Sequence, residues 1–245
     1  HELRDDWFDG VRSTPQQLES EQLAFAAMDA YQYAAMPMAA PAVEAMPHRD
    51  YGFSAGGFEF YVLDTRFERG APGTCIGFAK QHERFARWLQ EHTPAEDRPI
   101  FIVSPTPVFP FDVEAGRTED RMRGGGWQSY PQSLTQLFDA LFAAGCVSVV
   151  ILSGDRHISH RATGSVLHDD GRRITLDSIV SSGLNTPIPF ASDHPGDIQT
   201  SFKGPISPHC TLSYTITTES QSTGWAEVRI ETDAAGRWLV DAVFQ

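Results

Sequence analysis

Runs of apolar residues alternate with amphipathic segments through the first two thirds of the chain, and this pattern predicts buried strands interleaved with helices. The clearest run, residues 147–152, is mostly β-branched and is typical of a strand that is buried on both faces. Shorter apolar runs predict further strands at 58–64 and 99–103. Apolar residues at helical spacing predict helices at 15–36, 75–92 and 134–142.

After the central run the pattern changes to strands alone, joined by short turns. Asp169-Asp170-Gly171 is a hairpin signal, and a second turn is expected at 233–236. The strands are expected at 163–167, 173–180, 211–217, 225–231 and 238–244. Residues 37–52 and 187–208 are expected to be irregular, and the long glycine-rich stretch 109–130 is interpreted as a lid. This order fits one layered α/β domain, with two packed sheets.

Composition and charge narrow the possible partners. The chain has 245 residues, of which 41% are hydrophobic and 21% charged, as in an ordinary globular domain. It has no apolar run of about 20 residues, so no membrane span is expected. The formal net charge of −13 argues against a nucleic-acid surface, because phosphate neutralisation requires clustered Lys and Arg. The three cysteines have no zinc-site spacing, and Cys146 is expected to be a buried small apolar residue.

The residues that directly follow the central strand are candidates for chemistry. Gly154-Asp155-Arg156-His157 lies where ligands gather in open α/β sheets, beyond the carboxyl end of a strand. Asp155 and His157 are two positions apart, so in an extended segment their side chains point the same way. A carboxylate and an imidazole together suit Fe, Mn or Zn. The alternative is a structural one, in which the aspartate caps nearby amides and the histidine is a buried, hydrogen-bonded residue.

Four segments, in this order along the chain, resemble motifs of the PhoD-like alkaline phosphatases, a branch of the calcineurin-like metallophosphoesterases. They are residues 1–7, 61–66, 126–131 and 154–157. The resemblance covers most of the chain but only the second half of the family's catalytic domain. It therefore implies that residues 1–245 form one domain, the C-terminal portion of a layered αββα sandwich of two mixed sheets flanked by helices. The N-terminal part of the same protein is then expected as a missing partner.

The resemblance also implies the chemistry. It implies hydrolysis of small phosphoesters, as an alkaline phosphatase or phosphodiesterase, by a dinuclear metal site and a metal-bound hydroxide. By the same resemblance Asp155 binds one metal, His157 binds the other, and His1 stabilises the phosphoryl oxygens or protonates the leaving group. The metals implied are two or more ions of Fe, Ca, Mn or Zn. The family further implies a periplasmic or secreted protein.

Basic residues near the motifs are expected to offset the repulsion between an acidic protein and an anionic substrate. Arg156, Arg66 and Arg161 are the candidates, with Arg156 and Arg66 as the expected substrate-binding residues. A strand-end salt bridge is the alternative for Arg66. At Ser104-Pro105-Thr106, where the wider superfamily often has a metal-binding histidine, this sequence has none, so structural use of Thr106 is expected.

The sequence leaves two alternative functions. The first is a non-catalytic binding module derived from the same fold, with residues 109–130 serving recognition. The second is a serine hydrolase that uses Ser153 or Ser159 with His157, but the chain has no G-x-S-x-G elbow. Because the family's first metal motifs are not among these residues, the 245-residue chain alone is predicted to be inactive.

Overall fold

A computed structural model describes most of the chain from residue 49 onwards. The described residues are 49–65, 69–70, 75–76, 78–92, 97–113, 126–154, 158–181, 198–220 and 224–245, together with Glu19, Leu23, Ala26 and Ala27. Those four isolated residues are helical, and the rest of the helix expected at 15–36 lies outside the described residues. Residues 114–125 of the expected lid also lie outside them.

The described elements alternate between strand and helix first and are strands alone afterwards, as the sequence pattern predicts. They are β1 (Tyr51–Ala55), β2 (Phe58–Val62), α2 (Phe78–His92), β3 (Ile100–Ser104), η5 (Trp127–Ser129), α3 (Pro131–Ala143), β4 (Ser148–Ser153), β5 (Ser159–His168), β6 (Arg173–Val180), β7 (Ser201–Pro205), β8 (Cys210–Ser220), β9 (Ala226–Thr232) and β10 (Trp238–Phe244). The helix α3 ends as expected before Gly145, whose φ of 75° is a conformation that glycine adopts without strain.

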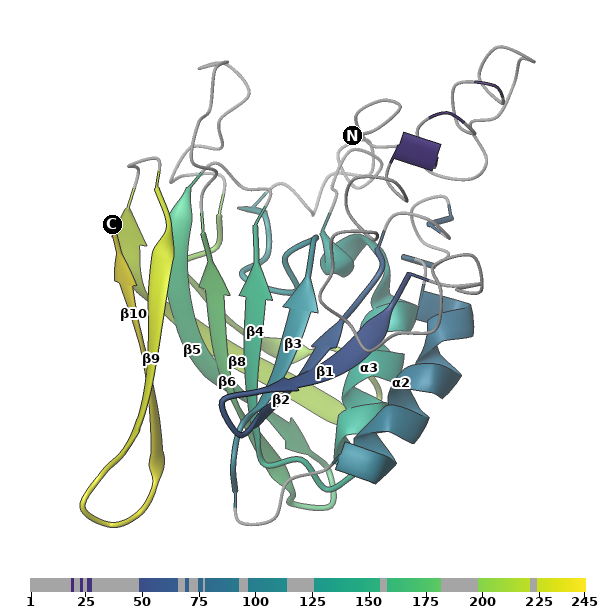
Figure 1. Ribbon diagram of the computed structural model, residues 1–245. Coiled ribbons are helices and arrows are strands. Elements are labelled where there is room, and N and C mark those ends of the chain that lie inside the picture. Colours follow the sequence, from purple (N-terminus) through teal and green to yellow (C-terminus); the bar gives the residue numbers. More distant parts are fainter. Residues whose placement is uncertain are drawn as a thin grey trace.

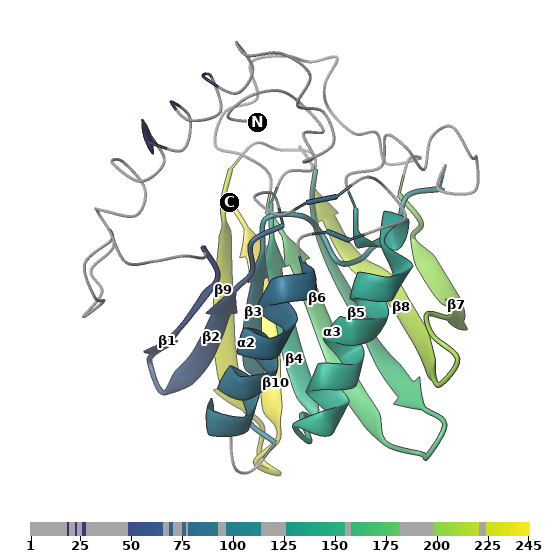
Figure 2. The same ribbon diagram turned by 90° about the vertical axis from the view of Figure 1, so that its right-hand side faces the viewer.

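One mixed sheet of eight strands organises the molecule, in the order β1-β2-β3-β4-β6-β5-β8-β7. The strands β2, β3, β4 and β6 are parallel to one another, and the pairs on either side of them are antiparallel. The helices α2 and α3 cover one face of this sheet, and the two-stranded β9–β10 sheet lies against the other (Figure 1, Figure 2). The α/β class is therefore confirmed, as a mixed multi-strand sheet with few helices.

The central strand β4 is buried on both faces because each face has its own apolar core. Val149 and Ile151 belong to the core beneath the helices, whereas Val150 belongs to the core beneath the β9–β10 sheet. This alternation explains why the strand has no polar positions in its middle. Cys146, directly before it, is 6% exposed, and burial raises the pKa of its thiol to about 11. Its expected role as a small buried residue is confirmed.

Two strands occur where the sequence pattern predicts irregular chain. The strand β1 begins inside residues 37–52, which are expected to be irregular. It contains Gly52, and glycine inside a strand normally weakens it. A Cβ at Gly52 would lie 2.1 Å from Nε1 of Trp88 on α2, so close packing of the helix explains the glycine. The strand β7 contains Gly204 and Pro205, and it forms because it is an edge strand, where proline is tolerated.

The β9–β10 sheet is fixed to the main sheet by two arginines. The guanidinium of Arg98 lies 5.9 Å from the ring centre of Phe58 on β2 and 5.6 Å from that of Trp238 on β10. Arg161 on β5 contacts Asp177 at 2.7 Å and Asp241 on β10 at 3.1 Å. Arg161 is thus occupied between the two layers, and the expectation that it serves an anionic substrate is wrong.

In the described part of the chain, no helix has the length and apolarity needed to cross a membrane.

A buried charge ties the start of the sheet to α2. Asp50 is 2% exposed, accepts hydrogen bonds from Tyr61 Oη at 2.5 Å and from Arg84 Nε at 2.9 Å, and forms an ion pair with the same guanidinium. Burial and the hydrogen bond to Asp50 raise the pKa of Tyr61, so its phenol stays protonated as a donor. The carboxylate joins β2 and α2 through two partners.

Asp50→Asn should therefore lower the free energy of unfolding by about 3 kcal/mol, because it removes the buried carboxylate that pairs with Arg84 and accepts from Tyr61. Urea unfolding of the wild type and the variant would measure the difference. Glu227→Gln is the control, because the Glu227–Arg229 pair is exposed to solvent and its loss should hardly change the free energy of unfolding. Equal losses in the two variants would contradict the prediction.

Candidate active site at the carboxyl edge of the parallel strands

The four parallel strands end at one edge of the sheet, and polar residues follow each of them. The arrowheads of β3 and β4 lie at this edge (Figure 1), and the register aligns Ser104 of β3 with Ser153 of β4, and Ser153 with Val180 of β6. The residues at the edge are Asp64 and Thr65 after β2, Ser104 and Thr106 at the end of β3, Ser153 and Gly154 at the end of β4, and Ser181 after β6. Such edges are where ligands bind in open α/β sheets.

The ends of β2 and β3 are bound to each other. Thr65 Oγ1 lies 2.9 Å from Thr106 Oγ1, and both side chains are buried. Gln81 of α2 fixes the adjoining backbone, because its amide donates to the Asp64 carbonyl and accepts from the Asp64 N–H at 3.2 Å. Thr106 therefore has the structural use that the sequence predicted. These contacts give the edge a rigid base.

Trp127 and Tyr130 pack beneath this edge and are both fully buried. Trp127 Nε1 donates to Ser104 Oγ at 3.1 Å, and the Ser104 hydroxyl donates to the Thr106 carbonyl. The indole also meets the Phe78 ring edge-on, with the centroids 5.6 Å apart. The two aromatic residues are thus part of the packed core.

The end of β4 differs from the ends of β2 and β3, because the hydroxyl of its last residue makes no hydrogen bond to the described residues. Ser153 Oγ is buried and has no hydrogen-bond partner in the part of the chain that the structure describes. The Ser153 carbonyl accepts from Ser181 N–H at 3.0 Å, which joins the ends of β4 and β6. The Ser153 hydroxyl therefore remains available to a group at this edge, two positions before Asp155.

The candidate metal ligands Asp155 and His157, the candidate substrate-binding residues Arg156 and Arg66, and His1 all lie outside the described residues. The structure describes both neighbours of the motif: Gly154 follows β4, and Ile158 precedes β5. Among the described residues there is no group of three or more His, Cys, Asp or Glu side chains that could hold a metal ion. The assigned roles of these five residues therefore stay predictions.

Arg69 is a residue that the sequence reasoning missed. It is 2% exposed, and its Nε donates to Tyr130 Oη at 2.8 Å. The backbone of Arg69 pairs with that of Ile76, which is tied to α3 by a hydrogen bond from its N–H to Ser133 Oγ at 3.3 Å. The sequence gives no signal for this burial, since the partners lie about 60 positions away.

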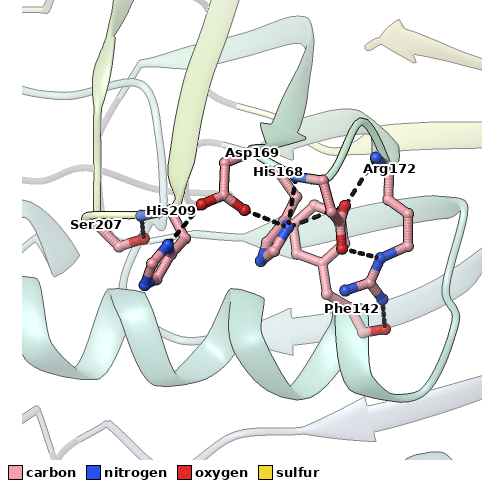
Figure 3. Close-up of polar contacts among 7 residues, drawn as sticks. Phe142, His168, Asp169, Arg172, Ser207 and His209 are labelled. Carbon is pink, nitrogen blue, oxygen red and sulfur yellow. Dashed lines mark hydrogen bonds and ion pairs between the residues drawn. The ribbon is translucent and has the colours of Figure 1, made fainter.

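The β5–β6 turn lies at the end of the sheet opposite the carboxyl edge, because β6 is parallel to β4 and begins at this turn. Figure 3 shows a cluster of titratable side chains there. The carboxylate of Asp169 in the β5–β6 turn bridges two imidazoles, with His168 Nδ1 at 3.0 Å and His209 Nδ1 at 2.7 Å. Asp170 lies 2.9 Å from His168 and 2.8 Å from Arg172, and Arg172 donates to the Phe142 carbonyl of α3 at 2.6 Å. The network therefore joins two turns and one helix end.

His168 and His209 are 41 positions apart in the sequence, so no local spacing indicates that they meet. The β5–β8 register pairs His168 with Cys210 and so places His209 beside the hairpin turn. The hydrogen bond to Asp169 raises the pKa of His209, and the same contact lowers the pKa of Asp169. Asp139 of α3 also favours the charged imidazole of His209.

Comparison with known proteins adds three findings. A family profile described as PhoD-like phosphatase matches residues 1–194. A solved structure titled "Structure of PhoD" is similar, with a TM-score of 0.53 and 20% sequence identity, over 74% of this chain and 38% of that one. This chain thus spans less than half of that solved chain. No curated protein matches.

The histidine–aspartate network gives a prediction about pH. His209 contributes stability below its ordinary pKa of 6.5, and this is lost as the pH rises through its raised value in the folded protein. Asp169 contributes above its ordinary pKa of 3.8, and this is lost as the pH falls through its lowered value. Asp169→Asn should therefore lower the melting temperature most between about pH 4 and pH 6.5.

Melting curves of the wild type and Asp169→Asn from pH 3 to pH 9 would test this window. Asp233→Asn is the matched control, because Asp233 pairs with Arg237 in another hairpin turn, and an arginine keeps its charge over this range. The effect of Asp233→Asn should persist at pH 9, whereas that of Asp169→Asn should fade. An Asp169→Asn effect that is as large at pH 9 as at pH 5 would contradict the assignment.

Proposed function

Because the chain belongs to the PhoD-like phosphatase family, we propose that it hydrolyses phosphoesters as part of a longer protein, with its active site at the carboxyl edge of the parallel strands. The single observation that carries this proposal is the position of β4, whose end joins this edge and whose next residues are Gly154-Asp155-Arg156-His157. The rigid contacts at the ends of β2 and β3 support it, since a site that positions reacting groups needs fixed neighbours.

We propose that Asp155 and His157 each hold one ion of a metal pair. The donor set fits iron, manganese or zinc, because these ions accept both carboxylate oxygen and imidazole nitrogen. When bound, such ions supply charge neutralisation at the phosphoryl group and lower the pKa of a water molecule. Ser153 Oγ supports the placement, since it is a buried oxygen with no partner among the described residues and lies two positions before Asp155.

The remaining roles concern the substrate. Arg156 and Arg66 are proposed to bind the phosphoryl oxygens, because a guanidinium matches the spacing of two such oxygens. His1 is proposed to stabilise these oxygens or to give a proton to the leaving oxygen, a role that suits an imidazole near neutral pH. The positive groups offset locally the net charge of −13 of the whole chain.

The finer architecture is part of the same proposal. We propose that residues 1–245 form one domain and that the β9–β10 sheet belongs to the second sheet of an αββα sandwich. Its contacts with Phe58 and Phe101 of the main sheet support this, because they form a second apolar core opposite the helices. Export to the periplasm or the cell exterior is proposed from the family alone.

Asp155→Asn and His157→Ala, made in the longer protein, should each lower turnover of p-nitrophenyl phosphate by at least about 100-fold and reduce the bound metal, because each removes one metal ligand. Elemental analysis and initial rates would measure the two effects. Asp169→Asn and His209→Ala are matched controls at the opposite end of the sheet and should change neither quantity. Full metal content and activity in the first pair would show that Asp155 and His157 are not metal ligands, whereas absence of turnover in the wild-type longer protein would favour a non-catalytic binding module.

Residues 1–245 alone should show no turnover of p-nitrophenyl phosphate, even with added iron, calcium, manganese or zinc. The reason is that the family's first metal motifs are not among these residues, so the metal pair lacks ligands. Release of p-nitrophenol at alkaline and neutral pH would be the measurement. Metal-dependent turnover by these residues without another chain would show that the ligand set is complete within them.

A further inference from the structure

The charge of Arg69 is not balanced by any carboxylate among the described residues. The side chain is 2% exposed, and its Nη1 is buried with no hydrogen-bond acceptor in the described part of the chain. The guanidinium carbon lies 5.3 Å from the centre of the Tyr130 ring, and Nε donates to the phenol oxygen of that ring. Tyr130 therefore fixes the guanidinium, but the described residues provide no negative partner for it.

The absence of an anion is unusual because a buried cation loses its hydration and normally pairs with a carboxylate. Five other described arginines do pair with a carboxylate. They are Arg84, Arg161, Arg172, Arg229 and Arg237. These five are all more exposed than Arg69, so arginines that keep more of their hydration have a carboxylate partner, whereas the buried Arg69 has none among the described residues.

Arg69 is also held rigidly. Its backbone pairs with Ile76, the N–H of Gly70 donates to the Cys75 carbonyl at 2.8 Å, and Ser133 of α3 accepts from the N–H of Ile76. Rigid placement of a binding group lowers the entropy lost when a ligand binds. The chain reaches Arg69 four positions after Thr65, whose hydroxyl belongs to the carboxyl edge of the sheet.

We propose that Arg69 binds a phosphoryl oxyanion, either the phosphoryl group of a substrate or the free phosphate ion. The planar guanidinium presents paired N–H donors that match two oxygens of a tetrahedral anion. The surroundings are of low polarity, which strengthens the attraction between the two charges. This inference rests on the proposed function for the class of anion, and it adds a binding residue that is distinct from Arg66 and Arg156.

Phosphate binding to residues 1–245 tests the inference without any hydrolysis. The chain, in a metal-chelating buffer, is titrated with inorganic phosphate at constant ionic strength, and the melting temperature and heat of binding are measured. The wild type should show a saturable rise in melting temperature, because a ligand that binds only the folded state stabilises it. Arg69→Met should bind phosphate at least tenfold more weakly. Arg229→Met, which removes an exposed and paired arginine, should bind as the wild type does.

Two further variants keep the test decisive if Arg69→Met does not fold. Arg69→Lys keeps the charge but loses the paired donors, and Tyr130→Phe removes the hydroxyl that holds Nε; both should weaken phosphate binding at least tenfold. In the absence of phosphate, Arg69→Met should be at least as stable as the wild type, and saturating phosphate should reverse that order. A purely structural arginine would make the variant less stable at every phosphate concentration.

Two outcomes would overturn the inference: no saturable effect of phosphate on the wild type, or equal phosphate binding by the wild type and all three site variants. Phenylphosphonate as a second ligand separates the sources, because its binding at Arg69 indicates the phosphoryl group of a substrate, whereas binding of phosphate alone indicates the free ion. Phosphate binding without turnover in the longer protein would refute the proposed function and leave Arg69 as an anion site. Turnover by the longer protein with no phosphate binding at Arg69 would refute the Arg69 anion site and leave the proposed function standing.

Discussion

Parallel pairing of β2, β3, β4 and β6 is the constraint on which the rest of this structure depends. Parallel strands require connections that cross a face of the sheet, so α2 and α3 come to cover one side. The middle strands are then buried on both faces, which requires continuous apolar sequences such as that of β4. The same pairing brings all four strand ends to one edge, where the polar residues of the candidate site gather.

The second face of the main sheet, opposite the helices, is covered by the β9–β10 sheet. It carries aromatic residues such as Phe60 and Phe101, whose rings stack with centroids 4.7 Å apart, and these need cover from water. The β9–β10 sheet gives that cover, and Arg98 and Arg161 fix it with contacts to the faces of aromatic rings and to carboxylates. Charged side chains thus hold the two layers in one orientation, which apolar contact alone does not specify.

The two ends of the sheet differ in how their polar groups are satisfied. At the end with the β5–β6 turn, acidic and basic side chains pair with one another in a network of hydrogen bonds and ion pairs. Ser153 Oγ at the carboxyl edge and Arg69 Nη1 beside Tyr130 are instead buried with no partner among the described residues. These two buried polar atoms are the basis of the proposals for metal and anion binding, because most buried polar groups in folded proteins have a hydrogen-bond partner.

The sequence by itself determined the class of the fold and the family. Apolar runs and helical spacing depend on neighbouring residues, so they located the central strand, both described helices and the late hairpins, and short motifs in the right order indicated the PhoD-like phosphatases. Only the tertiary structure decided the strands β1 and β7, because Gly52 fits against Trp88 and Pro205 lies on an edge strand. It alone decided that Arg161 joins two layers, that His168 and His209 share a carboxylate, and that Arg69 is a buried cation. These contacts join residues far apart in the sequence, and no local pattern encodes which of them meet in space.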